Sequence, residues 1–192
     1  DGHAYDTTLP AAPFATAAHA MGHVNVAFDS DGIVRRAALC FQAEPHDTQW
    51  PHVAELAYRE SSKAPSAAYK RQSDACGSEY LIPYTQRGAF AEISYSDILA
   101  GNVPAKLIEG RDIIVGATAT GMGDSFPTPN ADGGLLPGIE IIANMLGAVR
   151  HNNFIMPLGM TPYLLLSIAP LWILMLAFIF LRPQIALAVS LV

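Results

Sequence analysis

Residues 116–134 are the part of the sequence whose residue types best fit a binding site. They are rich in Gly, Thr, Pro and Asp, and they follow the apolar run Asp112-Ile-Ile-Val-Gly116, which predicts a strand. In open α/β sheets, ligands bind in loops at the carboxyl ends of parallel strands. We therefore expect a ligand pocket lined by Thr118, Thr120, Asp124, Ser125 and Thr128.

Asp124 has two interpretations, and the sequence leaves both open. Its carboxylate could bind a cation or a ligand amine, or it could accept backbone N–H bonds and fix the loop. A nucleotide is not expected here. The run from Gly116 to Gly121 has Thr118 where a dinucleotide fingerprint needs Gly, and no helix follows it directly.

Other patterns of catalytic or metal-binding residues are absent from the sequence. The six histidines have no paired metal-ligand spacing, and no GxSxG elbow or nucleophilic cysteine setting occurs. Asp29 and Asp31 resemble the start of a calcium loop, but its later ligands are missing, so turn chemistry explains them better. We predict no catalytic residue, no metal site and no cofactor.

Two pairs of residues have expected partners. Arg35 and Arg36 occupy adjacent strand positions, one facing each side, and one of them is expected to pair with an acidic loop residue. Cys40 and Cys76 fit either one disulfide or two buried thiols.

Strands alternate with helices, which predicts an α/β domain with a mixed sheet flanked by helices. The expected strands are residues 23–28, 33–41, 80–84 (at a sheet edge, because of Pro83) and 112–116, the last central, parallel and buried on both faces. The first two form a hairpin around Gly32. Two short helices are expected, at residues 13–21 and from Ser94 or Ser96 to Gly101. A third helix is expected to open at Trp50-Pro51 and to have on one face Val53, Leu56, Ala57 and Glu60. A fourth is expected from Pro137 to 151–153, with on one face Ile139, Ile142, Ala143, Leu146 and Val149. Residues 61–77 are expected to be an irregular loop.

The chain changes character near Thr161. Residues 161–181 contain no charged residue, and a segment of this length suits a transmembrane helix. Residues 184–192 begin a second apolar run after Arg182-Pro183. All 17 acidic residues and all but one of the 11 basic residues precede Thr161, which leaves that part with a net charge of −7. An acidic domain disfavours nucleic acid as a partner.

Several segments together resemble one family. AAHAMGHVNVAFDSDGIVRR, YLIPY, ISYSDILAG, LIEGRDIIVGATATGMGDSFPTP and LPGIEIIANML are similar, in order and spacing, to the second class of CHASE domain. The resemblance implies an extracytoplasmic sensory domain at residues 1–158, followed by transmembrane helices at 161–181 and from 184. The family's first membrane helix and first strand–helix unit would lie before Asp1, so the N-terminal part of the domain is expected to be missing.

The resemblance implies a function but no ligand. Such domains are input modules joined to a histidine kinase, a nucleotide cyclase, a cyclic-di-GMP enzyme or a serine/threonine kinase. We therefore expect a non-catalytic sensor of a small molecule or physical stimulus, a homodimer in the bacterial inner membrane with residues 1–158 in the periplasm. The alternatives are an exported hydrolase using Asp124 and a nearby His, and a structural membrane subunit that docks a partner.

Overall fold

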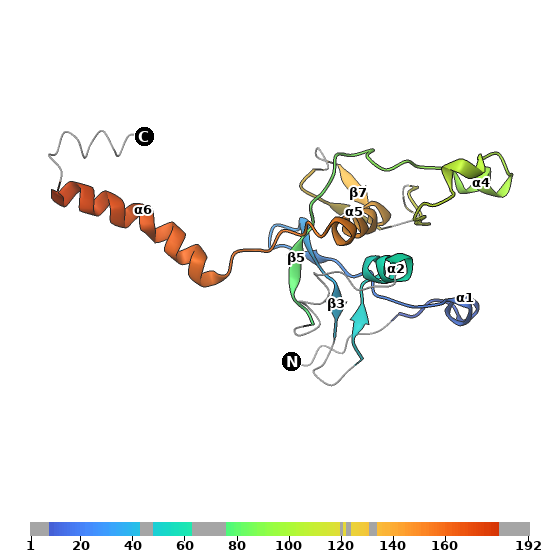
Figure 1. The fold of residues 1–192 in the computed structure, drawn as a ribbon, viewed down its shortest axis with the longest axis horizontal. Coiled ribbons are helices and arrows are strands. Elements are labelled where there is room, and N and C mark those ends of the chain that lie inside the picture. The colour runs from blue at the N-terminus through green and yellow to red at the C-terminus, as the bar shows by residue number, and fades with distance from the viewer. Residues whose placement is uncertain are drawn as a thin grey trace. The chain divides into compact units, whose positions relative to one another are not determined.

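The chain divides into two compact units, Asp1–Met156 and Pro157–Val192. The computed structural model describes residues 8–42, 48–62, 76–119, 121, 124–130 and 134–180. The first unit combines short strands with helices, as Figure 1 shows. It contains the hydrophobic core. The second unit contains helix α6 (Met160–Phe180). The predicted α/β class is therefore confirmed for the first unit.

The strands of the first unit form three small sheets. The largest has the order β1 (Ala27–Phe28), β2 (Val34–Ala38) and β5 (Glu79–Leu81), which places β5 at an edge as predicted. The two smaller sheets pair β3 (Cys40–Phe41) with β4 (Trp50–Pro51), and β6 (Ser125–Pro127) with β7 (Leu135–Pro137). All these pairings are antiparallel, and the only parallel contact among the described residues is an isolated bridge between His23 and His52.

The predicted hairpin around Gly32 is present between β1 and β2. Gly32 has φ of 77°, a backbone conformation that a residue without Cβ adopts at no steric cost. The backbone carbonyl of Asp29 accepts the Gly32 N–H at 2.8 Å, and the Asp31 carboxylate accepts the Ile33 N–H at 3.1 Å. Turn chemistry therefore accounts for both aspartates, as the sequence indicated.

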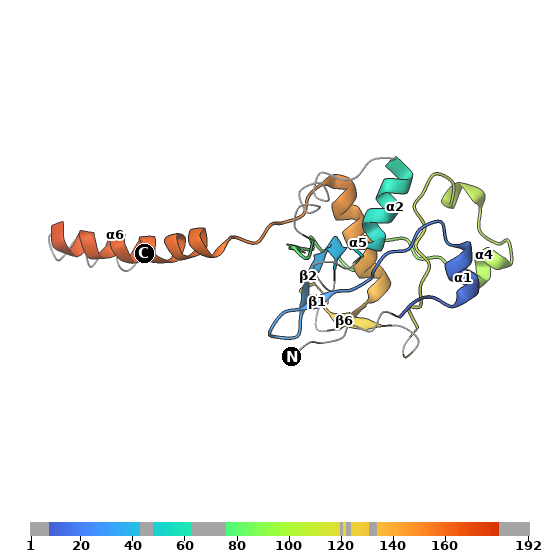
Figure 2. The same ribbon diagram turned by 90° about the horizontal axis from the view of Figure 1, so that it is seen from below.

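Two helices pack against each other over the core. Helix α2 (Val53–Ser62) contacts helix α5 (Gly138–His151), and the two lie side by side in Figures 1 and 2. The apolar side chains beneath them come from β2 and its flank, β5 and its flank, β7 and the two helices: Val34, Ala37, Leu39, Ala54, Tyr80, Ile82, Leu136, Ile141, Met145, Leu146 and Val149. Burial of this apolar surface is the main stabilising contribution to the unit.

The short helices lie outside this core. Helix α1 (Ala12–Ala17), helix α4 (Tyr95–Leu99) and the 3₁₀ turn η1 (Ala105–Leu107) contain no buried residue. Helix α4 follows Ser94 and precedes Gly101, whose φ is 72°, in agreement with the prediction for this stretch.

The prediction for residues 112–116 is wrong. The structure assigns them no strand, and Ile113 and Val115 are exposed, whereas Ile114 packs against the core. Three consecutive apolar residues predict burial on both faces of a strand, but only Ile114 of the three points inward. The mixed sheet with a central parallel strand is therefore absent from the described residues.

Helix starts and faces also differ from the predictions. Trp50-Pro51 does not open a helix, because these residues pair with β3 and the His52 N–H donates to the Leu39 carbonyl, so α2 begins at Val53. The buried residues of α2 are Ala54 and Glu55, and those of α5 are Ile141, Asn144, Met145, Leu146, Ala148 and Val149. Of the face predicted for α5, only Leu146 and Val149 are buried, and Ile139, Ile142 and Ala143 are half-buried, because the inward face is rotated toward Ile141, Met145 and Ala148. The predicted loop at 61–77 falls mostly in residues 63–75, outside the described part.

Helix α6 covers almost the whole charge-free segment, and it contains Pro170. Among the described residues, no helix has the combination of length and apolar character that crossing a membrane requires. The expected second apolar segment at 184–192 lies outside the described residues.

Cys40 and Cys76 form a disulfide, with their Cα atoms 5.2 Å apart. The bond joins β3 to the residues just before β5. It closes a loop over a sequence separation of 36, which restricts the unfolded chain.

We expect the double variant Cys40→Ala/Cys76→Ala to lose about 3–4 kcal/mol in free energy of unfolding, because a loop of this length regains its entropy in the unfolded state. Chemical denaturation of the purified chain measures the loss. Adding a reductant should destabilise the wild-type chain similarly and leave the variant unchanged. Equal stability of the two oxidised chains would contradict the structural role of the bond.

Candidate functional site

The structure brings only some of the predicted ligand residues together. Asp124 and Ser125 are exposed at the start of β6, and Thr128 is buried just after it, with 7% of its surface accessible. Thr118 is exposed in the preceding segment, and Thr120 lies outside the described residues. A ligand-binding role for these five residues remains a prediction.

The loop that carries Asp124 is fixed to the start of α5 through its backbone. The carbonyl of Asp124 accepts the N–H of Gly138 at 2.9 Å, and β6 pairs with β7, which leads directly into α5. A Cβ atom at Gly138 would lie 3.1 Å from a ring carbon of Phe126, so a larger residue here would require the ring to shift by a few tenths of an ångström. The peptide backbone of Asp124 therefore contributes to fixing the loop, and its carboxylate faces solvent.

Asn144 connects α5 to the segment that follows β5. Its Oδ1 accepts two hydrogen bonds from Thr85, at 2.8 Å from the backbone N–H and 2.9 Å from the hydroxyl. Its Nδ2 donates to the Glu140 carbonyl at 2.8 Å within the helix. Asn144 is buried, with 4% of its surface accessible, so these bonds satisfy an amide that is removed from water.

A second amide extends the connection to the predicted loop. Asn130 donates from Nδ2 to the Thr85 carbonyl, and its Oδ1 accepts the hydroxyl of Thr128 at 3.1 Å. Thr85 thus uses its N–H, hydroxyl and carbonyl in one network, which we call the Asn144 network: Thr85, Thr128, Asn130 and Asn144. It joins the segment after β5, the loop after β6 and the buried face of α5.

Charged side chains lie at the edge of this network. The Arg87 guanidinium donates to the Leu135 carbonyl at 3.5 Å, at the long limit of a hydrogen bond. Loss of hydration raises the pKa of Glu140 in the first turn of α5; the nearby carboxylate of Glu92 raises it further, and Arg87 opposes the shift. Hydroxyls, amides and charges of both signs suit the recognition of a small polar molecule.

Sequence reasoning found Thr128 but missed Thr85, Asn130 and Asn144. One signal was available for Asn144, which interrupts the apolar series Ile141, Met145, Ala148 and Val149 on the buried face of α5. A strongly polar side chain at such a position needs a partner inside the protein. Nothing in the sequence identified that partner, because Thr85 is distant along the chain.

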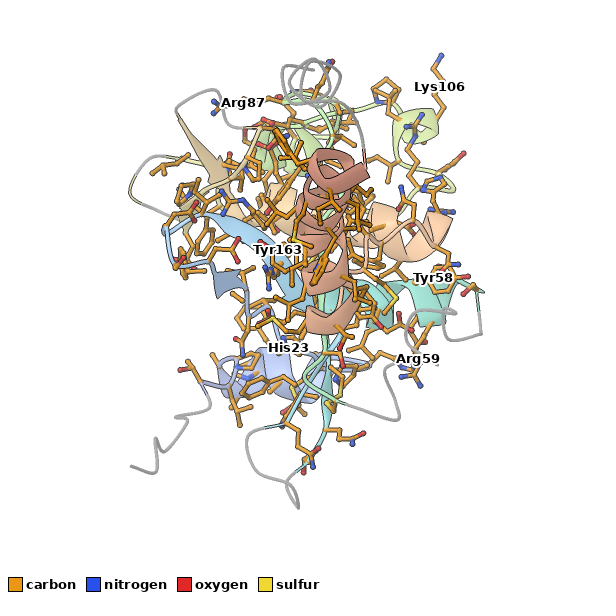
Figure 3. The ribbon with its side chains drawn as sticks, turned by 90° about the vertical axis from the view of Figure 1, so that its left-hand side faces the viewer. His23, Tyr58, Arg59, Arg87, Lys106 and Tyr163 are labelled. Atoms are coloured by element: carbon orange, nitrogen blue, oxygen red, sulfur yellow. A yellow bond between two sulfur atoms is a disulfide. The ribbon has the colours of Figure 1, made fainter. Side chains whose placement is uncertain are left out.

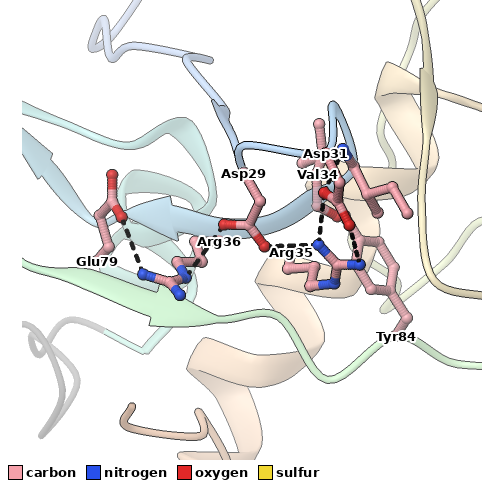
Figure 4. Close-up of polar contacts among 8 residues, drawn as sticks. Asp29, Asp31, Val34, Arg35, Arg36, Glu79 and Tyr84 are labelled. Carbon is pink, nitrogen blue, oxygen red and sulfur yellow. Dashed lines mark hydrogen bonds and ion pairs between the residues drawn. The ribbon is translucent and has the colours of Figure 1, made fainter. Parts of the chain in front are cut away.

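A separate network of charges stabilises the hairpin. Arg35 holds Asp31 with two hydrogen bonds of 2.8 and 2.7 Å and also donates to Asp29 at 2.8 Å (Figure 4). Arg36 lies 3.4 Å from the other oxygen of Asp29 and 4.0 Å from the carboxylate of Glu79 on β5. The prediction of an arginine paired with an acidic loop residue is confirmed. Both arginines reach Asp29, however, so they do not face opposite sides; the pairing of β1 with β2 is irregular here.

These pairs explain why the aspartates do not form a cation site. Hydrogen bonds from Arg35 lower the pKa of Asp31 to about 2, and they occupy the oxygens that a cation would need. Among the described residues, no group of three or more His, Cys, Asp or Glu side chains is placed to hold a metal ion.

His23 and His52 form a second polar feature inside the unit. Their ring centroids are 4.9 Å apart, and His52 is fully buried at the start of α2. Figure 3 shows His23 well separated from Arg87, so this pair is distinct from the Asn144 network. Each Nδ1 accepts a backbone N–H, from Asn25 at 3.2 Å and from Ala54 at 3.1 Å. A neutral ring that accepts at Nδ1 carries its hydrogen on Nε2.

The surroundings of the histidine pair favour its neutral form. Burial lowers the pKa of His52 to about 3, with a further contribution from His23, and burial lowers the pKa of His23 to about 4. Protonation would also place a hydrogen on Nδ1, where the backbone N–H already points. At neutral pH, His52 therefore acts as an acceptor for the start of α2, and His23 acts as an acceptor for the backbone N–H of Asn25.

Comparison with known proteins identifies the family. Residues 4–183 match the CHASE2 domain. The chain belongs to the CHASE2 family. A search of curated proteins found no match, and a search of solved structures found none either. CHASE2 domains are extracellular sensory domains of bacterial receptors and are not catalytic.

The CHASE2 assignment favours the sensor over the alternative of an exported hydrolase. Asp124, the residue that the hydrolase would use, is exposed and no described histidine is hydrogen-bonded to it. The Asn144 network consists of hydroxyls and amides, which bind and orient groups but do not supply a nucleophile paired with a base.

The histidine pair predicts how the stability of this CHASE2 domain depends on pH. Both folded-state pKa values lie below the ordinary value of 6.5, so the unfolded chain binds more protons between about pH 6.5 and 4. The free energy of unfolding should therefore fall as the pH drops through this window, by about 2 kcal/mol for His52 between pH 7.5 and 5.

His52→Asn tests this expectation, because the Asn side chain can still accept the Ala54 N–H. Between pH 7.5 and 5, we expect the free energy of unfolding to fall by less in the variant than in the wild type. The difference between the two falls should equal the contribution of His52. Urea denaturation at the two pH values measures the difference. The matched control is His151→Gln, an exposed position on α5, which should keep the wild-type pH dependence. An equal loss in the wild type and in His52→Asn would contradict the assignment.

Proposed function

We propose that this chain is the sensing part of a membrane-bound bacterial receptor, exposed outside the cytoplasm. The observation that carries the proposal is the CHASE2 match over residues 4–183, which covers nearly the whole chain. Residues up to about 158 would be periplasmic, and the receptor would lie in the bacterial inner membrane.

The proposed stimulus acts at the loop between residues 116 and 134. Exposed Thr118, Asp124 and Ser125 offer hydroxyl and carboxylate groups to a small polar ligand, and Arg87 and Glu140 offer charges of both signs nearby. Thr120, outside the described part, and the buried Thr128 complete the proposed set. A physical stimulus that displaces the same loop would act through the same contacts.

Helix α5 is the proposed output element of the sensing unit. The Asn144 network and the Asp124–Gly138 contact join the loop to this helix, so a change in one biases the position of the other. The helix ends at His151, with Asn152 in a left-handed conformation, and the second unit begins at Pro157. Because this connection is short, a displacement of α5 would be passed on to the start of the second unit.

Membrane attachment is the part of the proposal that rests on sequence. Residues 161–181 are uncharged, and a second apolar run follows Arg182. The large apolar side chains of α6 are exposed, for example Leu171 at 66% and Trp172 at 57%, and exposed apolar surface of this kind marks a site of contact with a membrane or a protein. A histidine kinase, nucleotide cyclase, cyclic-di-GMP enzyme or serine/threonine kinase would provide the output in the cytoplasm.

Reporter fusions in a bacterial host test the location of the sensing unit. Alkaline phosphatase is active only after export, so a fusion after Pro157 should be active and a fusion after Pro183 inactive. A cytoplasmic reporter such as green fluorescent protein should give the reverse pattern at the same two positions. An inactive phosphatase after Pro157 together with a fluorescent reporter there would overturn the proposed location.

A further inference from the structure

Residues 19–25 cross the start of helix α2, and we call them the His23 segment. The N–H of His23 donates to the Pro51 carbonyl at 3.0 Å, and the His23 carbonyl accepts the Val53 N–H at 3.0 Å. A Cβ atom on Gly22 would lie 2.5 Å from the Pro51 carbonyl oxygen. The segment therefore lies so close to the chain before α2 that only glycine fits at this point of the contact.

The ring of His52 caps helix α2. His52 directly precedes Val53, the first residue of the helix, and its Nδ1 accepts the Ala54 N–H at 3.1 Å. This is the bond that an N-cap side chain makes. The side chain of Ala54 belongs to the core cluster that also contains Ile141 and Met145 of α5. His52 therefore holds the backbone of a residue in the core that α2 and α5 share.

Protons would break the contacts of both rings. Nδ1 of His23 accepts the Asn25 N–H at 3.2 Å, so each histidine accepts a backbone N–H at the atom that an added proton would occupy. Two charged rings would also repel each other, because their centroids are 4.9 Å apart. At His52 the positive end of the α2 dipole opposes the charge as well. Protonation therefore removes the cap and drives the His23 segment away from the helix.

The neutral contact is itself incompletely hydrogen-bonded. Nε2 of His23 and Nε2 of His52 are buried and have no hydrogen-bond partner among the described residues. Because each Nδ1 is an acceptor, each Nε2 carries a hydrogen, and burial of these two unpaired donors costs free energy. Opening of the contact lets water accept both hydrogens. The closed and open arrangements are therefore closer in free energy than they would be for a fully hydrogen-bonded contact.

The groups that face the pair do not compensate an added charge. From β3 the uncharged ring of Phe41 faces His23, with the centroids 6.0 Å apart. From α2 the buried carboxylate of Glu55 lies three residues after His52, and a carboxylate in that position favours a protonated ring. Burial outweighs it, since the pKa of His52 is lowered to about 3 and that of His23 to about 4.

His19 belongs to the same segment but contacts the far end of α2. Its Nε2 lies 3.1 Å from the carboxylate of Glu60, and both side chains are exposed. Protonation of His19 would strengthen this pair, but exposed pairs of this kind contribute little to stability. The pair therefore does not hold the segment in place in acid.

We propose that acid is a stimulus of this chain, and that His23 and His52 detect it by releasing the His23 segment from the first turn of α2 when they gain protons. The release reaches α5 through Ala54 and the core around it. The inference rests on the proposed function for the location of the pair, which in the periplasm would experience the external pH. The opening itself is a property of the chain.

Two histidines give a steep response to pH. In the open arrangement both rings regain the ordinary pKa of 6.5. Between pH 7.5 and 5, each ring then multiplies the open population by about 30, and the two together by about 1,000.

Hydrogen exchange of the full chain at pH 7.5 and 5, corrected for the intrinsic exchange rates, measures this opening. The protection factors of the Val53 and Ala54 N–H groups should fall by about 1,000-fold at the lower pH. The Met145 N–H on α5 should stay more protected than both at each pH, which shows that the segment opens while the core remains folded.

Three kinds of variant test the assignment. In His52→Asn the side chain can still accept the Ala54 N–H but does not titrate, so the fall in protection should be about 30-fold smaller. His23→Asn should behave in the same way. His19→Gln, the matched control in the same segment, should keep the wild-type fall. Gly22→Ala should abolish protection at Val53 already at pH 7.5, because its Cβ displaces the segment.

The outcomes separate this proposal from its competitors. A fall that is large in the wild type and in His19→Gln but smaller in both histidine-to-asparagine variants supports it. Protection at Val53 and Ala54 that is independent of pH overturns it. Equal protection at Val53, Ala54 and Met145 means that the unit opens only as a whole, which also overturns it. An inactive phosphatase fusion after Pro157 would contradict the proposed location instead, and would leave the exchange results unchanged.

Discussion

The arrangement of the sensing unit depends on one buried amide. Asn144 lies on the inward face of α5 among apolar side chains, where an amide without partners would cost about 1–3 kcal/mol. Thr85 provides those partners with its N–H and its hydroxyl. The requirement fixes the segment after β5 against α5, and Asn130 then fixes the loop after β6 against the same segment. Three segments that are distant in sequence are therefore held by one set of hydrogen bonds.

This arrangement suits a sensor better than a rigid scaffold. Apolar packing between α2 and α5 stabilises the unit through contacts that are not directional. The hydrogen bonds of the Asn144 network are directional, so each position of the loop requires one position of the helix. In the proposed function, a ligand that binds one position of the loop would select the matching position of α5. The disulfide and the arginine–aspartate network lie in other parts of the unit and stabilise the hairpin and the strands around it.

Local chemistry could be predicted from the sequence where a few neighbouring residues determine it. Gly32 with Asp29 and Asp31 predicted the turn, and Asn152 and Asn153 predicted the end of α5. The adjacent Arg35 and Arg36 predicted that one arginine pairs with an acidic loop residue. The family could also be recognised, because its motifs are local. Burial could not be predicted at residues 112–118, since three apolar residues in a row do not reveal which of them point inward. Trp50-Pro51 has the residue types of a helix start, but its backbone pairs with strand β3 instead. The partner of Asn144 depends on contacts across 59 residues, which no local pattern contains.

Hydrogen exchange at the Thr85 amide tests the coupling most directly. Thr85 is an exposed residue outside helices and strands, so its N–H would normally exchange quickly. If the Asn144 network holds it to α5, this amide should be protected and should open together with the central amides of the helix. In Asn144→Ala its protection should disappear, whereas an exposed variant on the same helix, His151→Gln, should keep it. Rapid exchange at Thr85 in the wild-type chain, with α5 still protected, would contradict the account.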